Sequence, residues 1–205
     1  MNVVIIDYGM GNLGSVRRAF EECGAEVVVA DNPAELERAQ RIVLPGVGAF
    51  GRGMENLRAA GWPDAMRRAL DNPRVALIGL CLGMQLLAES GHEGGETPGL
   101  GLMKGAVKLL QPGRGERVPH VGWNEISLRR SGGLFRGIPD KTDFYFVHSY
   151  HLEGADPAQV AAVTPYCGSF VSALEAGNVC GVQFHPEKSS RPGFALLKNF
   201  LEAKA

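Results

Sequence analysis

Cys81 is the side chain whose surroundings in the sequence point most directly to chemistry. It stands in the middle of Gly-Leu-Cys-Leu-Gly at residues 79–83, directly after the apolar run of residues 75–78. The run predicts a buried strand, and residues 82–89 after it predict a helix. A strand that turns sharply into a helix through Gly-x-nucleophile-x-Gly is a nucleophile elbow. The pattern therefore predicts a nucleophilic Cys81, against the alternative of a buried, inert thiol.

The elbow would assist chemistry at Cys81 in two ways. The N-terminus of a helix carries unpaired N–H groups and a partial positive charge, which favour a thiolate. The backbone N–H of Leu82 would also point to the place where an oxyanion forms during attack. Glycine is needed on both sides of the turn because the strained backbone leaves no room for a Cβ.

A base for this nucleophile is offered by His185-Pro186-Glu187, which follows a strand-like run at residues 179–184. A carboxylate two positions after a histidine can orient the imidazole, as the acidic member of a triad does. Taken alone, His185 could be a hydrogen-bonded core histidine. Together with the elbow, the pattern predicts a triad of Cys81, His185 and Glu187.

A second oxyanion donor is expected from a loop beside the nucleophile strand. The segment Pro-Gly-Val-Gly at residues 45–48 follows another predicted strand. Its glycines would allow the backbone to turn N–H groups toward a substrate. An ordinary glycine-rich turn is the alternative, but the elbow favours an oxyanion strand made of Gly46, Val47 and Gly48, with the N–H of Val47 or Gly48 as donor.

These residues must be positioned by the predicted secondary structure. Strands are expected at residues 2–7, 26–30, 41–44 and 75–78, and helices at 15–23, 33–40, 54–60, 63–70 and 82–89. Such alternation predicts a parallel sheet covered on both faces. Further strands are expected at 106–110, 121–128, 143–150, 160–164, 171–175 and 179–184, before a last helix at 194–201. We therefore predict a single α/β domain over residues 1–205, with a central, mostly parallel sheet, helices on both faces and added antiparallel strands.

Composition excludes several classes of function. Lys plus Arg number 21 and Asp plus Glu 22, so the formal net charge of −1 argues against nucleic acid as a partner. The four cysteines are scattered without a C-x-x-C pair, which argues against a metal site. The N-terminal residues resemble no signal peptide, and no apolar run is long enough to span a membrane. We expect a cytoplasmic protein that does not bind membranes.

A competing signature lies near the N-terminus, where residues 9–14 read Gly-x-Gly-x-x-Gly between a predicted strand and a predicted helix. Asp31 ends the following strand, as in a dinucleotide-binding βαβ unit. This layout favours an NAD-linked enzyme as an alternative, but it leaves the elbow and the His185/Glu187 pair without a shared purpose. A catalytically idle interaction module on the same fold is the third possibility.

Taken together, the elbow and His185-Pro186-Glu187 resemble the class I (triad) glutamine amidotransferases. Three further stretches, at residues 7–12, 119–124 and 146–150, narrow the resemblance to the glutaminase subunits of imidazole glycerol phosphate synthase. The resemblance implies hydrolysis of glutamine to glutamate and ammonia through a glutamyl thioester, without a cofactor. The implied glutamine-binding residues are Gln85, Glu93, His148, Ser149 and Tyr150. Gln85 also lies one helical turn after Cys81, on the same face.

The resemblance further implies a partner. Ammonia would pass to a (β/α)8-barrel cyclase subunit in a heterodimer that makes imidazole glycerol phosphate and AICAR in histidine biosynthesis. The implied interface residues are Tyr8, Gly9, Met10, Gly11, Asn12, Trp123, Asn124, Tyr145 and Lys188. The resemblance also implies allosteric control, because glutaminases of this family are nearly silent until the cyclase binds its own substrate. A flip of the Gly46–Val47 peptide is one route to this control.

Overall fold

The centre of the molecule is a mixed sheet of eight strands, seen in a computed structural model that describes residues 1–203. Its order is β2-β1-β3-β4-β14-β13-β12-β9. The first five of these run parallel to one another, and the last three are antiparallel additions. The strands are β1 (Asn2–Ile6), β2 (Glu26–Ala30), β3 (Arg41–Leu44), β4 (Ala76–Leu80), β9 (Ser127–Leu128), β12 (Val160–Thr164), β13 (Phe170–Ala176) and β14 (Val179–Val182). The predicted α/β fold with a mostly parallel sheet and antiparallel additions is confirmed.

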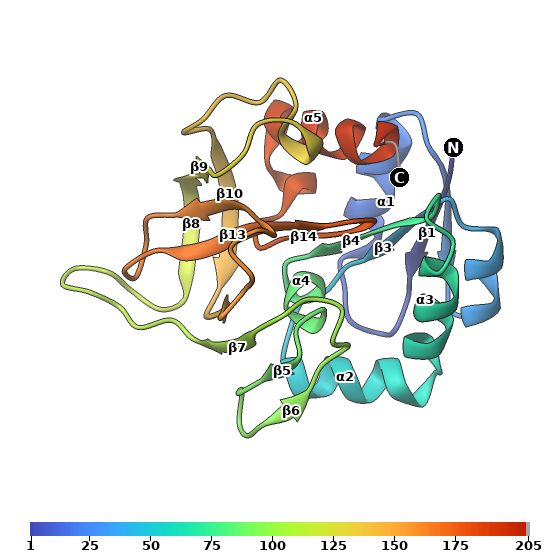
Figure 1. The fold of residues 1–205 in the computed structure, drawn as a ribbon, viewed down its shortest axis with the longest axis horizontal. Helices are drawn as coiled ribbons and strands as arrows, with labels where there is room; N and C mark the ends of the chain where they lie inside the picture. Colours follow the sequence, from blue (N-terminus) through green and yellow to red (C-terminus); the bar gives the residue numbers. More distant parts are fainter. Residues whose placement is uncertain (204–205) are drawn as a thin grey trace.

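Helices cover both faces of this sheet (Figure 1). On one face lie α1 (Leu13–Glu22) and α5 (Ser190–Glu202), and on the other lie α2 (Phe50–Ala59), α3 (Trp62–Leu70) and α4 (Leu82–Leu86). Alternate residues of β1 supply the two hydrophobic cores, with Val3 and Ile5 in one and Val4 and Ile6 in the other. A strand buried on both faces reads as one continuous apolar run, which is why the central strands were recognisable in the sequence.

Two small sheets stand beside the central one. The first pairs β8 (His120–Glu125) with β10 (Asp143–His148), and the second has the order β11-β7-β5-β6. Its strands are β11 (Tyr150–Glu153), β7 (Ala106–Leu109), β5 (Ser90–Gly91) and β6 (Thr97–Pro98). The predictions of unbroken strands at residues 121–128 and 143–150 were wrong, because each run is divided between two sheets. Continuous apolar character does not show where a chain leaves one sheet for another.

Helix boundaries also differ from the predictions. The expected helix at residues 82–89 ends at Leu86, because the chain turns to form β5 at Ser90. Residues 33–38 form the 3-10 helix η1 (Pro33–Arg38) rather than an α-helix, and α2 begins at Phe50 instead of residue 54. Two more 3-10 helices, η2 (Gly133–Phe135) and η3 (Pro186–Lys188), lie in segments without a predicted helix.

The strand order brings the loops that carry the predicted site residues to one edge of the central sheet. The chain runs in the same direction along β1, β3, β4 and β14, so their carboxyl ends meet there. Those ends lead into the loop at residues 7–12, the segment at residues 45–49, Cys81 and the segment at residues 183–188. The order also reverses at β1, which has β2 on one side and β3 on the other. Ligands of open α/β sheets bind at such a switch point.

Candidate active site

The backbone at Cys81 is strained as a nucleophile elbow requires. Cys81 has φ 53° and ψ −109°, outside the regions that residues with a Cβ normally occupy. Its N–H donates to the carbonyl oxygen of Val182 at 2.8 Å, which ties the elbow to β14. A Cβ on Gly79 would lie 2.7 Å from backbone atoms of Gly83, and one on Gly83 would overlap the carbonyl oxygen of Leu44. Both glycines therefore allow α4 to pack directly on the strands.

A cavity of about 270 Å³ opens at the Cys81 side chain. The sequence predicted all but one of its lining residues, which are Val47, Gly48, Cys81, Leu82, Gln85, Glu93, Val147, His148, Ser149 and Tyr150. They come from segments as far apart in the chain as residues 47 and 150. The missed residue is Val147, whose carbonyl oxygen lies 3.8 Å from the Cys81 sulfur. No side-chain signal could identify it, because its contribution is a backbone atom.

The expected oxyanion donors are not all free. The N–H of Leu82 points at the carbonyl oxygen of Gly46, with an N···O distance of 3.4 Å. Gly46 itself is tightly enclosed, since a Cβ there would lie 2.9 Å from the Cβ of Leu82 and would overlap the hydroxyl of Tyr8. In this conformation the Gly46 carbonyl occupies the direction along which Leu82 would bind an oxyanion.

His185 and Glu187 form a buried pair beside the elbow. The Nδ1 of His185 lies 2.8 Å from Oε1 of Glu187, and the two side chains are 4% and 2% exposed. Burial lowers the pKa of His185, but interactions with Cys81 and Glu187 outweigh it and raise this pKa to about 9. With Nδ1–H donating to the carboxylate, Nε2 is left as the proton acceptor, and it has no hydrogen-bond partner among residues 1–203. The pair can thus take up a proton from a neighbouring thiol.

Two polar side chains of the cavity are held by the backbone. Gln85 donates from Nε2 to the carbonyl oxygen of Tyr150 at 2.8 Å. Glu93 accepts the N–H of Phe50 at 2.7 Å, and so caps the first turn of α2. This hydrogen bond fixes the carboxylate of Glu93 at the cavity wall. A glutamate in a polar stretch of sequence would otherwise be expected to lie in a solvated loop.

His148 lines the cavity and meets the ring of His120 edge to face. The Nδ1 of His148 is 2.9 Å from the carbonyl oxygen of Tyr150, and its Nε2 is 3.0 Å from Nδ1 of His120. The Nδ2 of Asn124 lies 3.2 Å from Nε2 of His120, so the three side chains form a chain of hydrogen bonds. Burial lowers the pKa of His148 to about 3 and that of His120 to about 4. Both rings are therefore neutral, and they serve as rigid hydrogen-bonding groups rather than as bases.

Four of the nine predicted interface residues lie on β8, β10 and η3, namely Trp123, Asn124, Tyr145 and Lys188. Trp123 is 52% exposed, and its ring centroid lies 6.1 Å from that of Tyr145. The Nζ of Lys188 lies 5.9 Å from the centre of the Tyr145 ring, close enough for a cation–π contact. Val121, which also lies on β8, is 57% exposed. This exposed cluster is named the β8/β10 face below.

Tyr8 differs from the other predicted interface residues. Its side chain is only 5% exposed and donates to the carbonyl oxygen of Pro45 at 2.8 Å. Burial, with a smaller effect of Cys81, raises its pKa far above the usual range. The Tyr8 side chain therefore supports the segment at residues 45–48, and the contact of the loop at residues 8–12 with a partner stays a prediction. In the same loop, Gly9 and Asn12 are exposed.

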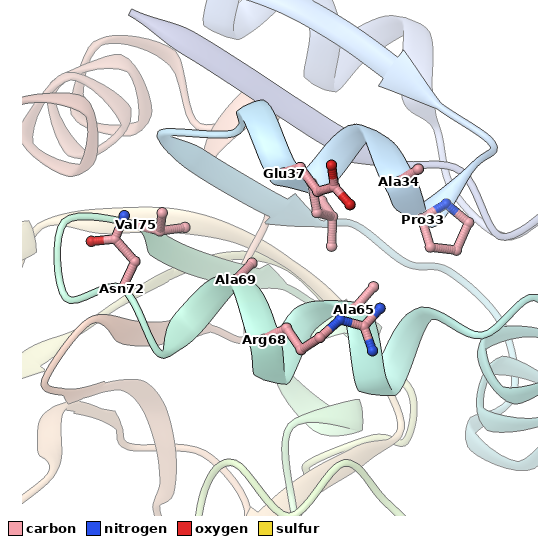
Figure 2. Close-up of a pocket in the computed structure, with 9 residues that line it drawn as sticks. Pro33, Ala34, Glu37, Ala65, Arg68, Ala69, Asn72 and Val75 are labelled. Carbon is pink, nitrogen blue, oxygen red and sulfur yellow. The ribbon is translucent and has the colours of Figure 1, made fainter.

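Other hollows lie away from this chemistry. The groove between η1 and α3 has Glu37 and Arg68 on facing sides (Figure 2). It shares no residue with the cavity at Cys81. Within residues 1–203, no three His, Cys, Asp or Glu side chains converge in a way that could hold a metal ion. No helix in the same range is long and apolar enough to cross a membrane.

Comparison with known proteins identifies the family of this fold and site. The family model described as "Glutamine amidotransferase class-I" matches residues 4–203, so the chain belongs to that family. "Imidazole glycerol phosphate synthase subunit HisH" of Moorella thermoacetica is 49% identical over 98% of this chain and 94% of its own length. The protein of the same name from Aquifex aeolicus is 44% identical, over 98% and 96%. The chain is a glutamine amidotransferase subunit of the imidazole glycerol phosphate synthase type, which acts in histidine biosynthesis.

Solved structures share the fold at low sequence identity. "Structure of PurLQS from Thermotoga maritima" superposes with a TM-score of 0.74 at 21% identity, covering 98% of this chain and 97% of that one. "Trypanosoma brucei CTPS - glutaminase domain with bound acivicin" gives a TM-score of 0.69 at 19% identity, covering 98% and 91%. These structures share the fold of this chain. Membership of the glutamine amidotransferase family sets aside the NAD-linked alternative.

Proposed function

We propose that this chain hydrolyses glutamine with Cys81 as nucleophile, His185 as acid and base, and Glu187 as the group that orients the imidazole. The observation that carries the proposal is the meeting of a strained Cys81, a cavity with polar walls and the buried His185–Glu187 pair at one edge of the sheet. Each is uncommon alone, and their convergence from distant parts of the chain is typical of an active site.

The reaction would proceed in two steps. The Cys81 thiol gives its proton to Nε2 of His185, and the thiolate attacks the amide carbon of glutamine. The resulting oxyanion collapses as His185 returns the proton to the departing ammonia, which leaves a glutamyl thioester on the sulfur. Water then attacks the thioester with His185 as base, and glutamate is released. Glu187 stabilises the imidazolium that forms in each step.

The amino-acid end of glutamine would lie against the far wall of the cavity. Glu93 offers a carboxylate for the α-ammonium group, and Gln85 lies between Cys81 and Tyr150 on the cavity wall. Backbone groups of the segment at residues 148–150 complete the wall. A cavity of about 270 Å³ has room for a single amino acid.

Activity would require a change at the oxyanion strand, because the Gly46 carbonyl lies where the Leu82 N–H points. A flip of the Gly46–Val47 peptide would turn that carbonyl away and bring the N–H of Val47 toward the oxyanion. Losing one such donor typically costs about 100- to 1,000-fold in rate. The arrangement with the Gly46 carbonyl facing the Leu82 N–H would therefore be a resting state of low activity.

The partner that would drive this change is a (β/α)8-barrel cyclase subunit, bound as a heterodimer. It would receive ammonia directly, because ammonia released into water is protonated and ceases to be a nucleophile, and it would form imidazole glycerol phosphate and AICAR. The β8/β10 face offers an exposed aromatic anchor in Trp123 for such a partner. The N–H of His185 donates to the carbonyl oxygen of Tyr145 at 2.9 Å, which links this face directly to the triad.

The test is release of glutamate from glutamine by the chain alone, and with a cyclase subunit and its ribonucleotide substrate. Cys81→Ala should reduce hydrolysis to the uncatalysed background. Cys23→Ala, which removes a thiol directly after the C-terminus of α1, should leave hydrolysis intact. Retained hydrolysis in Cys81→Ala would overturn the mechanism. Equal rates with and without the cyclase would remove the allosteric part and leave the triad chemistry standing.

A further inference from the structure

Gln183 is a fully buried polar side chain at the active site that the mechanism above does not use. It follows β14 directly and is 0% exposed. Its Nε2 lies 3.8 Å from the sulfur of Cys81, and its Oε1 lies 3.0 Å from Nε2 of Gln85. A buried amide must satisfy both its ends, and here both partners belong to the candidate active site.

The hydrogen-bond network decides which end of the Gln183 amide faces the sulfur. The carbonyl oxygen of Tyr150 can only accept, so the group that Gln85 presents to it must be the NH₂ end. The same NH₂ group supplies the hydrogen for Gln183, which must therefore present its oxygen to Gln85. Only the NH₂ end of Gln183 then remains for Cys81.

We propose that Gln183 is a positioning residue for the nucleophile: it donates a hydrogen bond to the Cys81 sulfur, stabilises the thiolate and ties it to the wall of the glutamine cavity through Gln85. This inference rests on the proposed function and extends it. A hydrogen bond to a charged acceptor is stronger than one to a neutral acceptor, so the contact gains strength when the thiol ionises. The neutral thiol has another partner, because it can donate to the carbonyl oxygen of Val147 at 3.8 Å.

Several ionisable groups share the surroundings of this sulfur. They come from the loop after β1, the loop after β5, the end of β10 and the segment that contains η3, and they are Tyr8, Glu93, His148, His185 and Glu187. Gln183 does not titrate. Gln183→Glu therefore adds one ionisable group next to the sulfur, with little change in shape and with the acceptor for Gln85 retained.

The experiment measures the rate of Cys81 alkylation by iodoacetamide from about pH 5 to about pH 10 in the full chain, by peptide mass spectrometry. The partly exposed Cys23 and Cys167 serve as internal controls in each sample. Gln183→Leu should move the midpoint of the Cys81 profile upward by about one pH unit through loss of the donor. Gln183→Glu should move it further, because a carboxylate repels the thiolate. Gln111→Glu, which makes the same change at an exposed site, should leave the midpoint unchanged.

The midpoint of Gln183→Leu distinguishes positioning from packing, because this variant removes the donor without adding a charge. A purely structural role predicts no shift of the midpoint in Gln183→Leu, whereas the charge added by Gln183→Glu repels the thiolate in either case. An unmoved midpoint in folded Gln183→Leu would overturn the inference, and Gln183→Met replaces Gln183→Leu if the latter does not fold. If that midpoint stays in place while Cys81→Ala abolishes glutamine hydrolysis, this inference alone fails. If Cys81→Ala still hydrolyses glutamine, the proposed function fails instead.

Discussion

The pKa values of two histidines near the same cavity, His148 and His185, are shifted in opposite directions, and their different neighbours explain why. His148 is buried near other histidines, and burial lowers its pKa to about 3. His185 is also buried, but Cys81 and Glu187 outweigh burial and raise its pKa to about 9. The protein thus holds one imidazole that takes up a proton readily and one that stays neutral as part of the cavity wall. Pairs of titratable groups with divergent environments commonly mark the acid–base machinery of an enzyme.

The His185–Glu187 pair should make stability depend on pH. The pKa of His185 is raised on folding, from 6.5 to about 9, so its contribution is fully present below about pH 6.5 and is lost as pH rises through about 9. Cys81 supplies part of this shift, so we expect the wild type to exceed Glu187→Gln in free energy of unfolding by about 1–2 kcal/mol near pH 6, and by little above pH 9. Urea denaturation at both pH values measures the difference. A gap that is the same at both would show that the ion pair is not its source.

Among the secondary-structure elements, the junction of β4 and α4 carries the most demanding geometry. The helix has only five residues, and it rests on β3 at a distance that only glycine permits. The same close approach places Cys81 in its strained conformation beside β14. Strain of this kind persists only where the surrounding packing determines it. The short helix is thus held by tertiary packing and not by its own length.

Gly83→Ala should therefore be costly, because its Cβ would overlap the carbonyl oxygen of Leu44, which belongs to β3 and cannot move away as a side-chain end could. We expect a loss of about 3 kcal/mol in the free energy of unfolding. Gly14→Ala is the matched control, since Gly14 lies inside α1 and a Cβ there would contact nothing within 4 Å. It should stabilise the chain by about 0.5–1 kcal/mol. Chemical denaturation of both variants tests this, and equal effects would contradict the packing argument.

On the scale of the whole molecule, the parallel strands of the central sheet and the separate β8/β10 sheet contribute to different parts of the proposed function. The parallel strands end together and deliver the loops that surround Cys81. Beyond them, β8 and β10 form a separate two-stranded sheet with large side chains on its exposed side. Scattered exposed apolar residues need no explanation, but an aromatic cluster of this kind is typical of a binding surface.

The proposed docking of the cyclase on the β8/β10 face predicts a large effect of Trp123→Ala on binding. A central aromatic anchor contributes about 2 kcal/mol or more, which corresponds to about a 30-fold rise in Kd. Val28→Ala is the control, because Val28 is 40% exposed on β2, at the opposite edge of the central sheet. Calorimetric titration with the cyclase measures both. An unchanged Kd for Trp123→Ala would place the interface elsewhere.

Local patterns in the sequence were enough to predict much of the fold and many residues around the cavity. The elbow is recognisable because its strand, glycines and helix lie within a few residues of one another, and helical spacing supports Gln85. Glu93 and the segment at residues 148–150 were expected from the family resemblance. The boundaries of β2, β3 and β12 were also predicted as observed, since buried strands are short apolar runs with turn residues at their ends.

Other features depended on how distant segments pack. The sequence did not indicate that residues 121–128 and 143–150 each divide between sheets, that Tyr8 lies buried under Pro45, or that Gln183 faces the Cys81 sulfur. Sequence alone determined the local conformations and the types of chemical group available, because backbone preference and hydrophobic period act between near neighbours. Only the tertiary structure decided which groups touch, because hydrogen bonds between residues a hundred positions apart depend on the register of the whole sheet.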